Sequence, residues 1–158
     1  MGAPLPALAQ ERLVSPALDG FVIGYQAANA EQSILEEVPQ GETVQAWSAM
    51  VTTQRFAVAN PSLAIFTDTF LANQRRACPG ATSTSPESFD HFGEPAVLFS
   101  ADCPRSPATG GREQMKVLAI SGDEALHVKQ VAFRPGYKGD TGWADEFLRG
   151  TRMCETDC

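Results

Sequence analysis

Residues 113–134 read EQMKVLAISGDEALHVKQVAFR, and this stretch decides the fold. Two apolar-rich segments of strand length, Glu113–Ser121 and Leu126–Arg134, flank the turn residues Gly122-Asp123-Glu124. Such an arrangement predicts an antiparallel hairpin. A further strand is predicted just before it at Ala96–Cys103, where apolar and polar residues alternate after Leu98.

The N-terminal half also contains strand-length segments separated by turn residues. Phe21–Ala28 and Ser33–Val38 are predicted strands joined by a turn at 29–31, because Asn tolerates the left-handed conformation that turns need. Thr43 is expected to cap a short helix that ends near Ala49. Residues 51–57 then return to strand.

Two longer helices are predicted. Asn60-Pro61 is typical of a helix start, and the apolar spacing carries this helix to about Ala77. The last helix begins at Asp140 or Thr141 and is expected to carry Trp143, Phe147 and Cys154 on one face. Because strands follow strands without alternating helices, the fold class is α+β. We expect a mainly antiparallel sheet of about six or seven strands covered by two amphipathic helices.

Length and charge limit the classes of function. A chain of 158 residues fits one domain, which we place at residues 20–154 with a C-terminal tail at 155–158. The net charge of −7 repels a phosphate backbone, so nucleic acid is not the expected partner. No apolar run approaches the roughly 20 residues of a membrane-spanning helix, and no transmembrane segment is predicted.

The first ten residues resemble the end of a targeting signal. Ala7-Leu8-Ala9 is an A-x-A pattern of the kind that precedes cleavage of a signal peptide. Residues 1–10 are therefore interpreted as a signal-peptide remnant, and the alternative is a disordered arm. The first interpretation predicts a periplasmic or secreted protein.

Four cysteines, Cys78, Cys103, Cys154 and Cys158, fit an oxidising compartment. They allow three complete pairings, of which Cys78–Cys103 with Cys154–Cys158 is favoured. A zinc site is the competing account. The expected close cysteine pairs are missing apart from the last two, so no metal site is predicted.

The segment VPQGETVQAW at residues 38–47, continued by MVTTQ at 50–54, resembles a motif of exported proteobacterial proteins of unknown function. This resemblance covers roughly residues 20–154 and implies export without implying an activity. The order of elements also resembles the PsbP-like superfamily, whose fold implies an α/β/α arrangement and accessory or binding roles.

The same segment supplies the candidate ligand-binding residues. Glu37 and Glu42 offer carboxylates, Trp47 offers a flat apolar surface, and Gln54 and Arg55 offer polar contacts. The alternative is structural, because a Trp three residues after Val44 is typical of a buried anchor.

No catalytic residue is predicted. The histidines, His91 and His127, are too few for a metal cluster, and the sequence has no nucleotide-binding or serine-hydrolase motif. We therefore expect an exported binding or accessory module without cofactor, acting on an unknown protein or small ligand. A small hydrolase using carboxylates and a histidine is one alternative, and a structural envelope or secretion-associated protein is another. A histidine hydrogen-bonded to a carboxylate in a pocket would favour the hydrolase.

Overall fold

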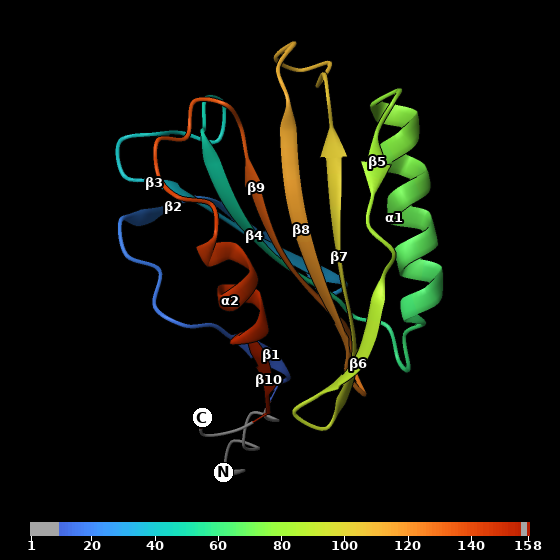
Figure 1. Cartoon of the computed structure of the whole chain (residues 1–158). Coiled ribbons are helices and arrows are strands. Elements are labelled where there is room, and N and C mark those ends of the chain that lie inside the picture. Colours follow the sequence, from blue (N-terminus) through green and yellow to red (C-terminus); the bar gives the residue numbers. More distant parts are fainter. Residues whose placement is uncertain (1–9, 156–157) are drawn as a thin grey trace.

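The computed structural model describes residues 10–155 and residue 158. It has an α+β fold built around one antiparallel eight-stranded sheet, with strand order β2-β3-β4-β9-β8-β7-β5 and with β6 also paired to β7 (Figure 1). The elements are β1 (Arg12–Val14), β2 (Phe21–Ala28), β3 (Gln32–Pro39), β4 (Ala49–Phe56), α1 (Leu63–Ala77), β5 (Thr82–Ser83), β6 (Glu87–His91), β7 (Glu94–Cys103), β8 (Glu113–Ser121), β9 (Leu126–Phe133), α2 (Trp143–Arg149) and β10 (Arg152–Cys154).

The strand count of six or seven was wrong, although the α+β class and the antiparallel sheet are confirmed. Ten strands form in the described part of the chain. Three of the extra strands, β1, β5 and β10, are two or three residues long. Two or three residues are too few to show a periodic pattern in the sequence. These segments are strands because each pairs with a strand that is distant in the sequence.

The predicted hairpin of residues 113–134 forms the centre of the sheet. β8 pairs with β9 from Gln114 opposite Phe133 to Ser121 opposite Leu126. Successive side chains of a strand point to opposite faces, so each central strand contributes to two cores. Leu118 and Ile120 belong to the core under α2, whereas Val117 and Ala119 belong to the core under α1.

The two helices therefore cover opposite faces of the sheet, and Figure 1 shows them on either side of it. We call these the α1 face and the α2 face. α1 packs its apolar side, including Phe66 and Phe70, against Phe99 and its neighbours. No helix in the described residues is long and apolar enough to cross a membrane.

The start of α1 lies two residues later than predicted. Asn60 takes a left-handed φ of 49° and stands outside the helix. Ser62 is the cap, and its hydroxyl oxygen accepts a hydrogen bond from the Ile65 N–H at 3.2 Å. The helix ends at Ala77, and its C-cap residue Cys78 forms a disulfide with Cys103 at the end of β7.

The last helix is shorter than predicted, because the prediction extended it to Cys154. α2 has only seven residues and stops at Gly150, where a Cβ atom would lie 2.7 Å from the Pro16 side chain. Cys154 is not on this helix; it lies in β10, which pairs with β1.

Cys154 forms a disulfide with Cys158, so the favoured cysteine pairing is confirmed at both bonds. Residues 1–9, which hold the expected cleavage site, lie outside the described residues.

The predicted helix at residues 43–49 is absent. Thr43 and Ala46 instead form an isolated bridge within a tight turn. The Glu42 carboxylate stabilises this turn, because it accepts hydrogen bonds from both the backbone N–H and the hydroxyl of Ser48. The backbone N–H and carbonyl groups of Thr43 and Ala46 pair with each other in this turn, and β4 begins three residues later at Ala49.

Candidate functional site

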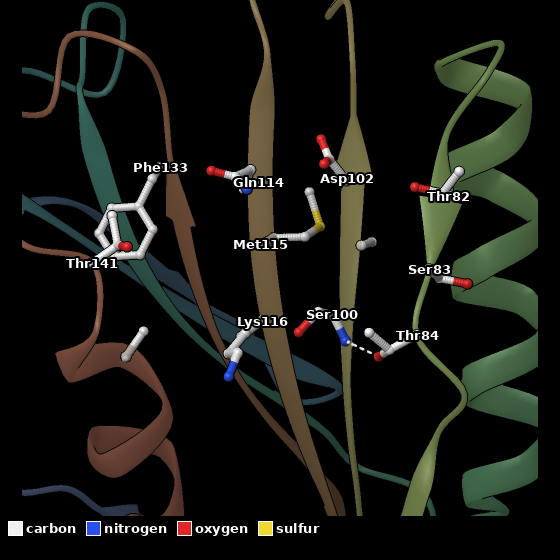
Figure 2. A pocket seen from close by; sticks show the side chains of 12 residues that line it. Thr82, Ser83, Thr84, Ser100, Asp102, Gln114, Met115, Lys116, Phe133 and Thr141 are labelled. Atoms are coloured by element: carbon white, nitrogen blue, oxygen red, sulfur yellow. Dashed lines mark hydrogen bonds between the residues drawn. The ribbon is translucent and has the colours of Figure 1, made fainter.

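A groove lies on the α2 face, between α2 and the edge strand β5. Its volume is about 370 Å³, and Figure 2 shows the side chains around it. Its lining residues are Thr82, Ser83, Thr84, Ser100, Ala101, Asp102, Gln114, Met115, Lys116, Phe133, Thr141 and Ala144. We call this hollow the α2 groove.

The sequence of β7 and β8 explains why the groove is open. On the α2 face, β7 runs from Ala96 and Leu98, which are buried in the core, to Ser100 and Asp102. β8 makes the same change from buried Leu118 to Lys116 and Gln114. Because α2 spans seven residues, or about 10 Å at 1.5 Å per residue, it covers only part of this face. The polar half of the two strands therefore becomes the floor of the groove.

The far wall comes from the segment at residues 82–84. Thr82 lies opposite Asp102 in the pairing of β5 with β7. Thr84 continues this pairing beyond β5. Its hydroxyl oxygen accepts from the Ser100 N–H at 2.9 Å (Figure 2), and its own N–H donates to the Ser100 carbonyl at 3.0 Å. Both threonines therefore lie on the α2 face, beside the floor.

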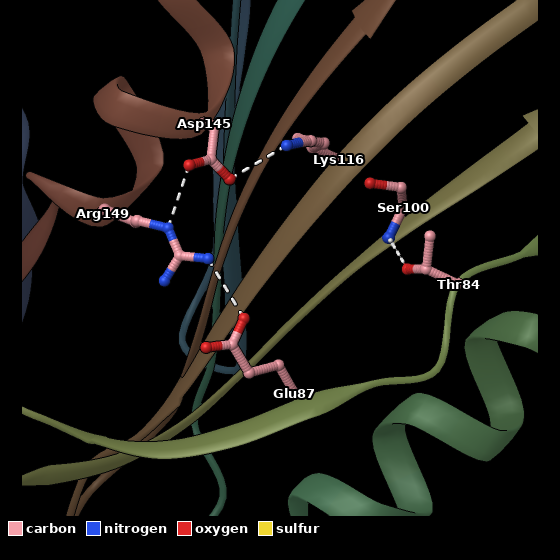
Figure 3. Close-up of polar contacts among 6 residues, drawn as sticks. All are labelled: Thr84, Glu87, Ser100, Lys116, Asp145 and Arg149. Carbon is pink, nitrogen blue, oxygen red and sulfur yellow. Dashed lines mark hydrogen bonds and ion pairs between the residues drawn. The ribbon is translucent and has the colours of Figure 1, made fainter.

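An ionic chain borders the groove on the α2 side. Lys116 Nζ lies 2.9 Å from Asp145 Oδ1, and Arg149 Nε lies 2.9 Å from Asp145 Oδ2. Arg149 also contacts Glu87 of β6 at 3.0 Å, so the chain joins α2 to two strands (Figure 3). The hydrogen bond from Lys116 is the largest cause that lowers the pKa of the Asp145 carboxyl. Partly exposed pairs like these add little stability, but they fix the directions of the side chains.

The second charged group in the lining is also paired. Arg112 Nε lies 3.0 Å from Asp102 Oδ1, and this hydrogen bond is the main cause that lowers the pKa of the Asp102 carboxyl. Both charged residues of the lining, Asp102 and Lys116, thus have an opposite charge within the protein. The groups left for a ligand are hydroxyls and the Gln114 amide, beside an apolar wall at Phe133 and Ala144.

The five candidate residues from the sequence lie outside this groove. Glu42 is engaged by Ser48 in the turn, and Glu37 lies in β3 opposite Val51. Trp47 is half-buried against the core under α1, and the Arg134 guanidinium stacks 3.7 Å from its ring centroid. Both observations give Trp47 a packing role beside the start of β4.

Gln54 and Arg55 lie toward the other end of β4. The five or six strand residues between Ala49 and these side chains span roughly 17–20 Å. They line a different hollow, of about 560 Å³, together with Glu11 and His127. The structure therefore separates the candidate residues into two regions, and ligand binding by them stays a prediction.

The second hollow contains a histidine–carboxylate contact. His127 Nε2 lies 3.3 Å from Glu11 Oε1, and the two residues are only 1% and 2% exposed. The Glu11 carboxylate also accepts the backbone N–H groups of Asp123 (2.8 Å) and Glu124 (3.1 Å). Burial opposes ionisation of Glu11, yet these hydrogen bonds outweigh it and hold its pKa below the usual value.

Burial has the opposite result for His127. It is the largest influence on the imidazole and lowers its pKa, although Glu11 acts against this shift. The pair therefore consists of a neutral histidine and an ionised glutamate that ties the N-terminal segment to the β8–β9 turn. His91 is likewise occupied, because its Nε2 lies 2.6 Å from the Thr151 carbonyl oxygen.

The α2 groove was missed by the sequence interpretation. Its signal was the change from apolar to polar residues along one face of β7 and β8, at Ser100 and Lys116. In comparisons with known proteins, no family model and no curated protein sequence matches this chain. The resemblances to exported proteobacterial proteins and to the PsbP-like superfamily therefore stay predictions.

Proposed function

We propose that this chain is an exported, disulfide-bonded binding module that holds a small, uncharged, hydroxyl-bearing ligand in the α2 groove. The observation that carries the proposal is the lining itself: hydroxyls and an amide line a sheet face that α2 leaves open. A volume of about 370 Å³ falls in the range of small-molecule sites, roughly 300–1,000 Å³.

The ion pairs support an uncharged ligand. A charged ligand group that binds Asp102 or Lys116 would compete with the ion-pair partner already there, Arg112 or Asp145, and full displacement would leave a charge without its partner. Hydroxyl groups of a sugar or polyol need no such displacement. They pair with Thr82, Thr84 and Gln114, each of which offers both a donor and an acceptor.

The apolar wall gives the ligand a second kind of contact. Phe133 and Ala144 face the groove beside the hydroxyls, and the C–H face of a sugar ring or a short alkyl chain fits against them. Small-molecule sites commonly combine apolar surface with a few placed polar groups.

A binding role agrees better with this groove than catalysis does. The described residues that line it include no histidine or cysteine, and the two ionisable side chains among them, Asp102 and Lys116, are each held in an ion pair. Two disulfides are compatible with an oxidising compartment outside the cytosol, which supports the proposal of export.

Calorimetric titration with a panel of uncharged sugars and polyols tests the proposal. We expect at least one member to bind, and Thr84→Phe to weaken that binding at least tenfold by filling the groove. Thr69→Phe is the matched control, because Thr69 is also exposed but lies on α1. Binding that Thr84→Phe leaves unchanged would place the ligand site elsewhere.

The hydrolase alternative has one observation in its favour, the His127–Glu11 contact in the second hollow. Against it, both Glu11 oxygens are occupied by backbone N–H groups, so the carboxylate is committed to the β8–β9 turn. Hydrolysis of p-nitrophenyl acetate by the native chain, lost in His127→Gln with the fold retained, would favour the enzyme.

A further inference from the structure

The β2 edge of the sheet is an exposed strand with an apolar and uncharged surface. β2 pairs with β3 on one side and is the last strand of the sheet order on the other. Val22, Ile23 and Tyr25 are 42%, 58% and 48% exposed, and these are half of the six large apolar residues exposed in the described chain. Edge strands usually carry charges or proline that prevent pairing, and Phe21–Ala28 carries neither.

The surroundings of this edge are acidic. Between positions 19 and 42 the chain has five acidic residues, namely Asp19, Glu31, Glu36, Glu37 and Glu42, and no lysine, arginine or histidine. Asp19 and Glu31 flank the two ends of β2. Glu36 lies opposite Tyr25 and Glu37 opposite Ile23, so the neighbouring strand presents one carboxylate on each face.

The geometry points to β2 as a docking edge for an extended peptide whose apolar centre is flanked by lysine or arginine. The backbone of such a peptide pairs with the open side of β2 as an added strand. Its apolar side chains lie beside Ile23 on one face and Tyr25 on the other. Its basic ends meet Asp19 and Glu31, which gives the complex charge complementarity.

A second copy of this chain fits the edge less well. Antiparallel pairing of two β2 strands about a two-fold axis would bring Asp19 of one copy toward the Glu31 end of the other, where like charges repel. The register shift between Ile23 and Tyr25 also bends and twists the strand at Gly24. Such a bulge limits continued edge-to-edge assembly and is compatible with one short added strand.

This surface is independent of the α2 groove, because β2 and β5 stand at opposite ends of the sheet order. A failed sugar titration therefore leaves the peptide proposal standing, and the reverse also holds.

The test uses fluorescent peptides with the core Thr-Val-Val-Val-Thr, whose valines face both sides of an added strand. The core is flanked at both ends either by two lysines or by two glutamates. Fluorescence anisotropy is expected to show binding of the lysine-flanked peptide at least tenfold tighter than that of the glutamate-flanked one. The double variant Ile23→Lys with Tyr25→Lys should weaken binding of the lysine-flanked peptide at least tenfold, because charged side chains on an edge strand oppose its pairing with another strand.

The matched control is Val58→Lys with Ile65→Lys, which adds the same charge at exposed apolar positions outside β2. We expect this control to bind almost as the native chain does, within about threefold. An equal loss of affinity for the lysine-flanked peptide in both double variants would overturn the assignment of the site to β2. Long-range attraction by the net negative charge would then explain the binding.

A measurement on the native chain avoids any folding defect of the variants. Amide hydrogen exchange, followed by NMR, should slow within 21–28 when the lysine-flanked peptide is added, since the added strand accepts bonds from open N–H groups. Unchanged exchange in β2 with the peptide bound would overturn the proposal. Sedimentation that shows a dimer lost on Ile23→Lys with Tyr25→Lys would assign the edge to a second copy instead.

Discussion

Removal of the Cys78–Cys103 disulfide should cost more stability than removal of the Cys154–Cys158 disulfide. The first bond joins the end of α1 to the end of β7 across a sequence separation of 25, and both cysteines are buried. In the chain-entropy description, a loop of this length is worth about 3.5 kcal/mol at 25 °C. The second bond spans a separation of 4, for which the same relation gives about 1.9 kcal/mol.

Urea unfolding at neutral pH measures the difference. The double variants Cys78→Ala with Cys103→Ala and Cys154→Ala with Cys158→Ala should differ by about 1.6 kcal/mol in free energy of unfolding. Cavity formation widens this gap, because both cysteines of the first pair are buried, whereas only Cys154 of the second pair is buried and Cys158 is exposed. A cost for the first pair no greater than that for the second would refute the reasoning that loop length governs their contributions.

Three further perturbations follow from packing and titration. Trp47→Ala should cost about 2 kcal/mol in urea unfolding, below the range of about 3–5 kcal/mol for a fully buried aromatic, because Trp47 is half-buried under the Arg134 guanidinium; an unchanged midpoint would show that this stacking contributes nothing. Stability should fall as the pH decreases from about 6.5, because residue 127 is protonated in the unfolded chain at a higher pH than His127 is in the folded chain. A second fall is expected below about 4.3, where the stabilising ionised form of Glu11 is lost. In His127→Gln the first of these falls should disappear from the unfolding profile, and its persistence would assign it to another group. Gly122→Ala should displace the Glu11 carboxylate, which lies too close to the added Cβ, and thermal unfolding should show a lower Tm than the control Gly111→Ala, whose added Cβ meets only ordinary van der Waals contacts; equal melting of the two variants would contradict the tight contact.

Elements with their own local signals were predictable from the sequence. The central hairpin at residues 113–134 and the helix that ends at Ala77 follow from strand length, turn residues and apolar spacing. The favoured disulfides also form, because Cys78 and Cys103 stand at the ends of two elements that pack together.

Features that depend on a distant partner were not predictable. The three residues of β1 form a strand only because β10 lies beside them. The segment at residues 43–49 has helical spacing, but the contact between Glu42 and Ser48 forms a tight turn instead. Local propensity is too weak to outweigh such contacts.

The candidate site shows the same limit. Sequence reasoning grouped Glu42, Trp47 and Arg55 because they are close in the chain, but β4 carries them to opposite ends of the sheet. The α2 groove depends on the short length of α2, which the sequence interpretation overestimated by extending the helix to Cys154.

The most direct test of the groove as a ligand site is an NMR titration of the isotope-labelled native chain with glucose, glucose 6-phosphate and glucuronate. These probes share one ring and differ in charge. The account predicts that the largest amide shifts occur at residues 82–84, Ser100 and Gln114, and that the uncharged sugar produces them at the lowest concentration. Stronger shifts with either anion, or shifts confined to residues outside the groove, would contradict it.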